Sequence, residues 1–373
     1  MTDDPDGTLI EFRAMTHALL LEGNKNEELK IDFMIPEVNL DRFIRAHLSK
    51  QKGCDGYLGK LDLATLDPVL ADLLHRVQGR MNNTLGLAGS QTLGGAQLPP
   101  IHFDYIHVSD LTPNAHVFQH EGFSFIVLTL PMVALVLNLS IRLGQSQRVV
   151  SLLNISAGGT EGNSLSSLLF EMLLNFFVSH EYAHLFLQHG GTQNLGAANV
   201  WTEFVENSGG ENLYAQAQEL DADAFAATVV LNYFLQRRAA LPFLFQGNDQ
   251  DEILMTSFLL GTMASFCAFW FKNQTASISV WKATHPPPHV RLTNLVRTCA
   301  AWCDENGSVP IGLFSAEKLL GLFDAAVEYI PLAARPSWDL LMTYLETPDG
   351  SEYQRQLFDH FTEIRQKRAQ TLS

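Results

Sequence analysis

Residues 168–191 constrain this chain most strongly, because ionisable side chains interrupt an otherwise apolar helical pattern there. Apolar residues recur at helical spacing on both sides of the interruption, and Gly190 and Gly191 follow as a predicted helix stop. The interruption reads HEYAH at residues 180–184. Burying such groups without partners costs several kcal/mol, so the pattern predicts that a bound ligand satisfies them.

The spacing of the two histidines points to a metal ion as that ligand. His180 and His184 are four residues apart, so on a helix both imidazoles leave the same face and can meet one ion. Glu181 follows the first histidine and points to the side, where it can reach a water molecule on that ion. The layout is typical of a zinc hydrolase. The alternative is a pair of core histidines beside a surface glutamate.

A catalytic zinc site needs a third protein ligand and one open position. Residues 213–231 predict a second helix, on which Glu219 and Asp223 share a face. We expect Glu219 to be the third ligand and Asp223 to accept the far N–H of a ligating imidazole. A solvated acidic face is the alternative for this helix. The rival third ligands are Glu203, Glu206 and Glu211.

HEYAHLFLQH followed by ELDAD resembles the gluzincin metallopeptidases. The closer resemblance is to the family of the CAAX prenyl endopeptidases, the bacterial heat-shock membrane proteases and their small soluble relatives. Residues 284–292, THPPPHVRL, are similar to the His-Pro-Pro segment of that family, which has an arginine six residues after its histidine. Residues 113–117, PNAHV, are similar to its strand beside the substrate cleft. The resemblance covers about residues 113–292.

The resemblance implies a role for each matching residue. It implies zinc on His180, His184 and Glu219, with Glu181 as general base and Asp223 supporting a ligand. It further implies that His285 and Arg291 approach the cleft for substrate or oxyanion contacts, with His289 as a second candidate for the part of His285. It also implies that Asn114 and Ala115 are the substrate-contacting positions of the strand. The insert at residues 190–210 departs from the family pattern, and a lid beside the metal is one role we consider for it.

The sequence predicts an α+β fold that is predominantly helical. We expect a zincin-like catalytic core with a small β-sheet, an HExxH active-site helix and helical accessory regions. A strand at 101–108, a strand followed by a helix within 123–141, and several helices after residue 291 support this prediction. We expect an N-terminal accessory region at 1–95, a catalytic domain at 96–300 and a C-terminal helical region at 301–373. Residues 123–130 are expected to offer an edge strand to an extended peptide.

Composition restricts the partners and the location. The chain has 373 residues and a net charge of -16, which argues against nucleic acid as the main partner. The uncharged runs at 123–141 and 253–271 are long enough to span a membrane. The acidic start has no export signal and the flanking charges give no sidedness, so we favour a cytoplasmic protein over an integral membrane protein. The oligomeric state is left open.

These features together predict a zinc-dependent endopeptidase that hydrolyses a protein or peptide substrate. A zinc-activated water would attack the peptide bond, with Glu181 as general base. The cytosolic Lit-type phage-exclusion peptidases share a zincin motif and are a related possibility. The alternative from another class is a zinc-binding scaffold or regulatory protein without hydrolytic activity. The presence of Glu181 argues against it, because a structural site needs no base.

Overall fold

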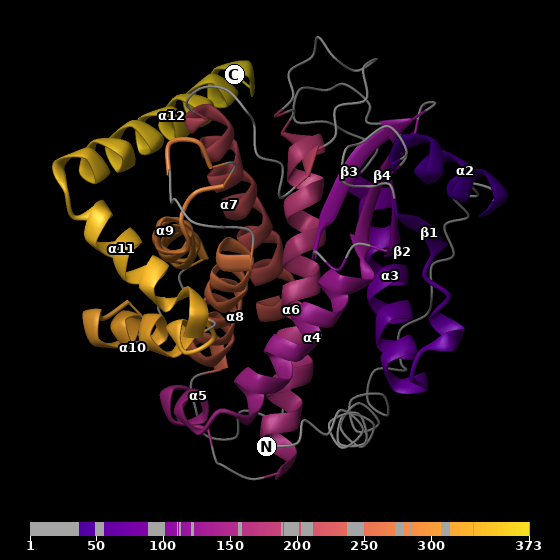
Figure 1. Cartoon of the computed structure of the whole chain (residues 1–373), viewed down its shortest axis with the longest axis horizontal. Helices are drawn as coiled ribbons and strands as arrows, with labels where there is room; N and C mark the ends of the chain where they lie inside the picture. The colour runs from indigo at the N-terminus through magenta and orange to yellow at the C-terminus, as the bar shows by residue number, and fades with distance from the viewer. Residues whose placement is uncertain are drawn as a thin grey trace. The chain divides into compact units, whose positions relative to one another are not determined.

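In the computed structural model (Figure 1), the chain forms two compact units. Unit 1 comprises Met1–Ser151, Ile155–Phe186 and Gly190–Trp201, and unit 2 comprises Leu152–Asn154, Leu187–His189 and Thr202–Ser373. The boundary falls inside the predicted 96–300 region, and the predicted domain limits stay a prediction. The described residues are 37–48, 56–88, 101–109, 111, 113–120, 123–155, 159–187, 189, 201–202, 212–236, 250–272, 280–283, 285–306, 314–330 and 332–372.

A mixed sheet forms the centre of unit 1, with the strand order β1-β2-β4-β3-β5. Its strands are β1 (Tyr57–Lys60), β2 (Ile101–Val108), β3 (Ala115–His120), β4 (Phe123–Thr129) and β5 (Trp201–Thr202). The strands β2 and β4 are parallel, whereas β1 pairs with β2 and β3 with β4 in antiparallel fashion. The expectation that residues 123–130 form an edge strand was wrong, because β4 lies between β2 and β3. The hydrophobic run shows that the strand is buried, not which strands flank it.

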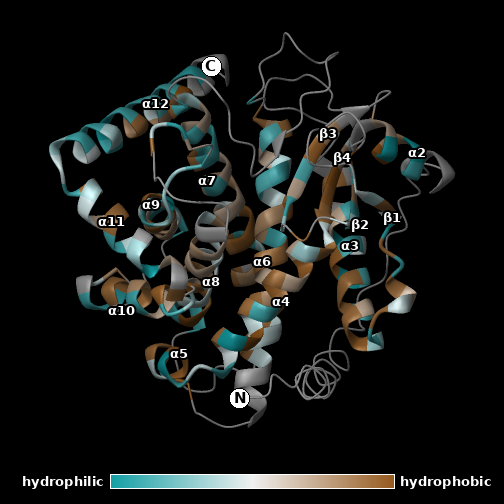
Figure 2. Ribbon diagram, in the orientation of Figure 1, coloured by the Kyte–Doolittle hydropathy of each residue, from teal (hydrophilic) through white to brown (hydrophobic). Residues whose placement is uncertain are grey.

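Helices cover both faces of this sheet. The helical elements up to residue 186 are α2 (Glu37–Leu48), the 3-10 turn η1 (Leu63–Thr65), α3 (Pro68–Ala88), α4 (Leu130–Gln145), α5 (Gln147–Leu152) and α6 (Gly159–Phe186), of which α2, α3, α4 and α6 contact strands. On one face, Phe43 and Ile44 of α2 join a cluster with Phe118 and Phe125. Residues that alternate with this set point to the other face, where α3, α4 and α6 pack on the strands. Hydrophobic residues, drawn in brown, are frequent in β4 and in the helices α4 and α6 (Figure 2).

The uncharged run at residues 123–141 is a strand followed by a helix, as predicted. Strand β4 ends at Thr129, and α4 begins at Leu130 with Pro131 in its first turn. Proline suits that position because its missing N–H would have no helical partner there. This uncharged run therefore supplies a central strand and the helix that packs against α6.

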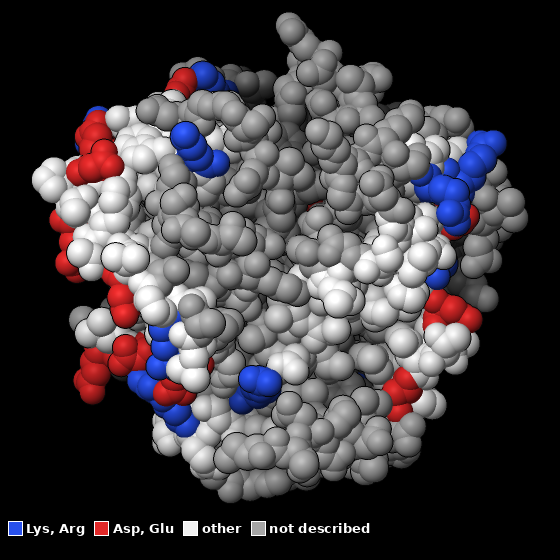
Figure 3. Space-filling view, viewed as in Figure 1, with Lys and Arg blue, Asp and Glu red and all other residues white. Residues whose placement is uncertain are grey.

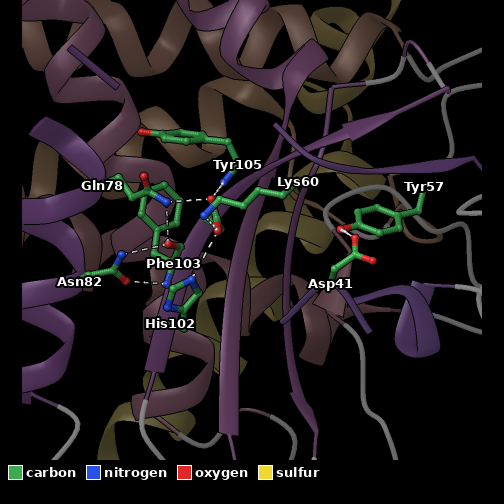
Figure 4. A network of polar contacts seen from close by, with 9 residues as sticks. Asp41, Tyr57, Lys60, Gln78, Asn82, His102, Phe103 and Tyr105 are labelled. Carbon is green, nitrogen blue, oxygen red and sulfur yellow. Dashed lines mark hydrogen bonds and ion pairs between the residues drawn. The ribbon is translucent and has the colours of Figure 1, made fainter. Parts of the chain in front are cut away.

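Side chains close the edge of β2 beyond the point where β1 ends (Figure 4). The Asn82 amide accepts a hydrogen bond from the N–H of Phe103 at 2.7 Å and donates one to its carbonyl at 3.1 Å. One turn earlier on α3, Gln78 donates to Oδ1 of Asp104 at 2.7 Å, and Nζ of Lys60 lies 3.0 Å from Oδ2 of Asp104. Asp104 is 1% exposed, so these contacts compensate the cost of burying its charge. The network fixes α3 to β2.

Replacing Asn82 by alanine should therefore lower the free energy of unfolding by about 2 kcal/mol, because it leaves a strand N–H without its acceptor. Urea denaturation measures the change. The matched control on the same helix is Arg76→Ala, which removes an exposed ion pair with Asp72 and should cost less than about 0.5 kcal/mol. Equal losses in the two variants would contradict a role for Asn82 in closing this edge.

Apart from Thr202 at the end of β5, all regular secondary structure among the described residues of unit 2 is helical. Its elements are α7 (Leu213–Gln236), α8 (Gln250–Lys272), α9 (Pro288–Asn306), α10 (Ala316–Val327), η4 (Leu332–Ala334), α11 (Arg335–Leu345) and α12 (Pro348–Leu372). Helix α7 packs against α8, α9 and α12, and α8 packs against α9 and α10. With the sheet of unit 1, this confirms the predicted predominantly helical α+β class.

The second uncharged run lies in α8. Among the described residues, Gln250–Trp270 is the one helix long and apolar enough to cross a membrane by length and composition alone. Of its most apolar window, 94% is buried inside the structure. A core helix of a globular protein passes the same test, so this observation is weak support for a membrane span.

Charged side chains on α12 form exposed ion pairs. Arg355 contacts Glu352 at 2.5 Å and Asp359 at 2.7 Å, and Lys367 contacts Glu363 at 2.6 Å. On the face seen in Figure 3, basic and acidic side chains among the described residues lie in small groups. The expectation that nucleic acid is not a partner stays a prediction.

Candidate functional site

The two motif histidines lie on α6 with their rings turned toward each other. Their Nε2 atoms are 3.2 Å apart, and both side chains are buried. Two nitrogens bound tetrahedrally to one zinc at about 2.0–2.1 Å are separated by about 3.3–3.4 Å. The observed spacing of His180 and His184 therefore fits a shared zinc ion within a few tenths of an ångström. Glu181, adjacent to His180, is also buried.

Packing inside unit 1 holds this pair in place. Helix α6 is continuous from Gly159 to Phe186 and contacts α3, α4, β3 and β4. The Phe176 ring lies 6.2 Å from the His180 ring, between centroids, and Ala183, the residue before His184, is fully buried. The predicted stop at Gly190 and Gly191 lies outside the described residues. A ligand pair on a well-packed helix is held more precisely than one on a loop.

Three alternating carboxylates on α7 each face a basic side chain within unit 2. Nε2 of His285 lies 3.1 Å from Oε2 of Glu219, and Nε2 of His189 lies 3.0 Å from Oδ2 of Asp221. Asp223 pairs with an arginine. The exposed fractions of the three carboxylate residues are 6%, 3% and 0% in chain order. The alternative interpretation of α7 as a solvated acidic face was therefore wrong.

The arginine paired with Asp223 is Arg291. Its Nε and one terminal nitrogen donate to the two carboxylate oxygens at 2.7 and 2.6 Å, and its guanidinium lies 3.7 Å from the Phe266 ring centroid. Nearby, Asn294 donates to the Leu220 carbonyl at 2.6 Å. In the structure the Arg291 guanidinium is thus a partner of Asp223. The expected support of a ligating histidine by Asp223 and the expected substrate contact of Arg291 stay predictions.

The segment before α9 brings His285 to Glu219. The side-chain amide of Gln216 on α7 donates to the carbonyls of Val280 at 2.8 Å and Ala283 at 2.9 Å. Residues 286–288 are prolines, which fix the backbone φ angle, and Pro288 begins α9. Because the start of this segment is hydrogen-bonded to α7 and its end is stiff, His285 has little freedom to move away from Glu219.

His289, the second histidine of this segment, is half-buried on α9 with its Nδ1 atom enclosed. Burial lowers its pKa to about 4, because the charged form would be removed from water. His289 is therefore neutral at neutral pH, and any contact it makes with a substrate is a hydrogen bond rather than an ion pair. Its predicted contact with substrate stays a prediction.

The two strand positions expected to contact substrate lie where β3 begins. The N–H of Asn114 donates to the hydroxyl of Thr129 at 3.0 Å, and the N–H of Thr129 donates to the Asn114 carbonyl at 3.0 Å. Ala115 is fully buried and pairs with Leu128. A substrate contact by Ala115 would therefore involve its backbone. The rival ligands Glu203, Glu206 and Glu211 and most of the 190–210 insert lie outside the described residues.

Comparison with known proteins adds one finding. A family model described as Peptidase U49 matches residues 163–308. This part of the chain is similar to a peptidase family. The family is of the Lit type, and its model spans the 180–184 motif, the α7 carboxylates and the segment at 285–291. No curated protein and no solved structure gives a significant match. The similarity to Peptidase U49 suggests peptidase activity, and the resemblance to the CAAX prenyl endopeptidases is not shown.

One buried pair escaped the sequence analysis. His189 and Asp221 contact each other, yet they are separated by 32 positions and by the insert. The available signal was a third histidine in HEYAHLFLQH and a middle carboxylate in ELDAD. Neither has a partner at helical spacing, so pattern analysis passes over both.

Proposed function

We propose that this protein is a zinc-dependent endopeptidase in which His180, His184 and Glu219 bind the metal and Glu181 is the general base. The observation that carries the proposal is the 3.2 Å separation of two buried imidazole nitrogens on one helix. The similarity to Peptidase U49 supports the reaction class. A protein or peptide is the substrate class that follows from it.

The donor set suits zinc. The three buried side chains offer two imidazole nitrogens and one carboxylate oxygen, a group that could hold a metal ion. Three protein ligands of these types leave one position for water, as in catalytic zinc sites. The contact of Glu219 with His285 involves Oε2, so it is compatible with metal coordination through Oε1. Such a contact would orient the ligating carboxylate.

In this proposal each residue of the site has its own role in the reaction. When bound, zinc supplies a Lewis acid that polarises a carbonyl and makes a water molecule more acidic. Glu181 would take the proton of the attacking water and return it to the leaving amine, which is one group acting first as base and then as acid. His285 would hold Glu219 in one orientation. The buried surroundings of Glu181 strengthen each of these electrostatic interactions.

Purified wild-type protein should contain one zinc per chain, and an anomalous-scattering map should place it on His180, His184 and Glu219. Chelation should abolish cleavage of denatured protein substrates, and zinc should restore it. We expect Glu219→Ala to weaken zinc binding more than about 100-fold, because loss of a mere supporting contact already costs 10–100-fold. Competition with a fluorescent chelator measures the affinity.

The matched control is Glu252→Ala, which removes a carboxylate on α8 that lies 3.4 Å from Lys318 in the same unit. It should leave zinc affinity unchanged. Full zinc binding by Glu219→Ala would exclude Glu219 as a ligand and favour Glu203, Glu206 or Glu211. Stoichiometric zinc without cleavage of any tested protein or peptide would favour the non-hydrolytic scaffold.

A further inference from the structure

The chain passes from unit 1 to unit 2 directly after the motif helix. Helix α6 ends at Phe186, and the next described residues, Leu187 and His189, belong to unit 2. The connection thus begins only three residues after His184. Whatever fixes this connection limits where the histidine pair can lie with respect to unit 2.

His189 is fixed to α7 by its side chain and by its backbone. Its Nε2 atom lies 3.0 Å from Oδ2 of Asp221, and its carbonyl accepts a hydrogen bond from the side chain of Gln218. His189, Asp221 and Gln218 are all buried, so the contacts form in a low-dielectric setting where they are strong. Gln218 and Asp221 flank Glu219 in sequence. The anchor of the connection and the proposed carboxylate ligand therefore share one turn of α7.

We propose that the His189–Asp221 pair is a positioning device for the metal site, which tethers the histidine helix to the turn of α7 that carries Glu219. The proposal rests on the proposed function. His189 lies five positions after His184, and an extended chain spans at most about 3.6 Å per residue, so the tether cannot exceed about 18 Å. A zinc site tolerates deviations of only about 0.2 Å in its ligand distances. A short tether reduces the number of positions that the histidine helix can take relative to Glu219, and so makes it easier for all three ligands to bind one ion.

In this proposal His189 and Asp221 position the metal ligands and do not bind zinc themselves. A positioning pair should affect zinc affinity through geometry, and a substitution that keeps the hydrogen bond should preserve the effect. The side-chain N–H donor of glutamine and the Nε2–H donor of histidine lie at similar distances from the backbone. His189→Gln therefore tests geometry separately from the imidazole itself.

The experiment measures zinc dissociation constants by chelator competition for wild type, His189→Ala, His189→Gln and Asp221→Asn. We expect His189→Ala and Asp221→Asn to weaken zinc binding by about 10–100-fold, as for other outer contacts of a metal site. We expect His189→Gln to stay within about threefold of wild type. The double variant His189→Ala/Asp221→Asn should bind zinc no worse than the weaker single variant, because the two residues act as one pair. Cobalt substitution adds a spectrum that reports the ligand geometry directly.

The matched control is Asn232→Ala, a substitution on α7 far along the helix from Glu219. It removes the acceptor of the hydrogen bond that Trp302 donates to Asn232 at 2.8 Å. It should lower thermal stability to a similar extent but leave zinc affinity and the cobalt spectrum unchanged. Should His189→Ala fail to fold, the isosteric Asp221→Asn and the conservative His189→Gln still decide the question. If the wild type binds zinc and the variants bind it with unchanged affinity, this inference is overturned and the proposed function is not. Wild type without zinc overturns the proposed function and this inference with it.

Discussion

Glu181→Gln should retain zinc at wild-type affinity and lose peptide-bond cleavage by between about 10² and 10⁴-fold in kcat/KM. General-base catalysis contributes a factor of that size, and a glutamine amide cannot accept the proton of an attacking water. The amide matches the carboxylate in shape, so the packing around this buried position is preserved. Cleavage of denatured casein, zinc content and thermal unfolding are measured on the same preparations.

The matched control is Glu171→Gln on the same helix, almost three turns before Glu181. Glu171 forms an ion pair with Arg80 inside unit 1, so this variant changes the same functional group at a structural position. We expect its activity to stay within about twofold of wild type. Equal activity of Glu181→Gln and wild type would remove Glu181 from the mechanism even if zinc is bound.

The local parts of the fold and of the site could be predicted from the sequence. Residues 180–184 lie on a buried helix, residues 219–223 lie on another, and the run at 123–141 is a strand and a helix. Each prediction rests on a periodicity within one segment, which steric rules fix locally. The 3.2 Å contact between His180 and His184 belongs to this class, because four residues make one turn.

The parts that failed or were missed depend on contacts between distant segments. Strand β4 was expected at an edge and lies between two strands, because neighbour order in a sheet is a tertiary property. The partners of Asp221 and Asp223 lie 32 and 68 positions away. Helical spacing shows which side chains share a face of α7. It does not show which residues of other segments meet that face.

Asp223→Ala should lower the free energy of unfolding by about 3–5 kcal/mol, because it removes the carboxylate that pairs with the buried Arg291 guanidinium. The matched control is Asp359→Ala, which breaks the exposed pair with Arg355 on α12 and should cost less than about 1 kcal/mol. Urea unfolding with a constant m-value separates a loss of stability from a change in the unfolded state. A loss for Asp223→Ala as small as that of Asp359→Ala would show that water reaches Arg291.

Arg291→Lys should not preserve the stability of the wild type. The two hydrogen bonds to Asp223 match the planar fork of a guanidinium, and the contact with Phe266 uses its flat face. An ammonium group offers neither, so we expect Arg291→Lys to lose about 2 kcal/mol or more. Removing both charges in Asp223→Leu/Arg291→Met should cost less than Asp223→Ala alone, because no buried charge is left unpaired.

The double variant also decides between the two roles of Arg291. The resemblance to gluzincin peptidases gave this arginine a substrate contact, whereas its observed partner is Asp223, one turn of α7 after Glu219. An internal role predicts that a folded Asp223→Leu/Arg291→Met protein keeps its zinc affinity and its KM for a peptide. A substrate role predicts that the same folded protein keeps its zinc and loses kcat/KM. Because the pair is removed together, the comparison is free of the unpaired charge that complicates each single variant.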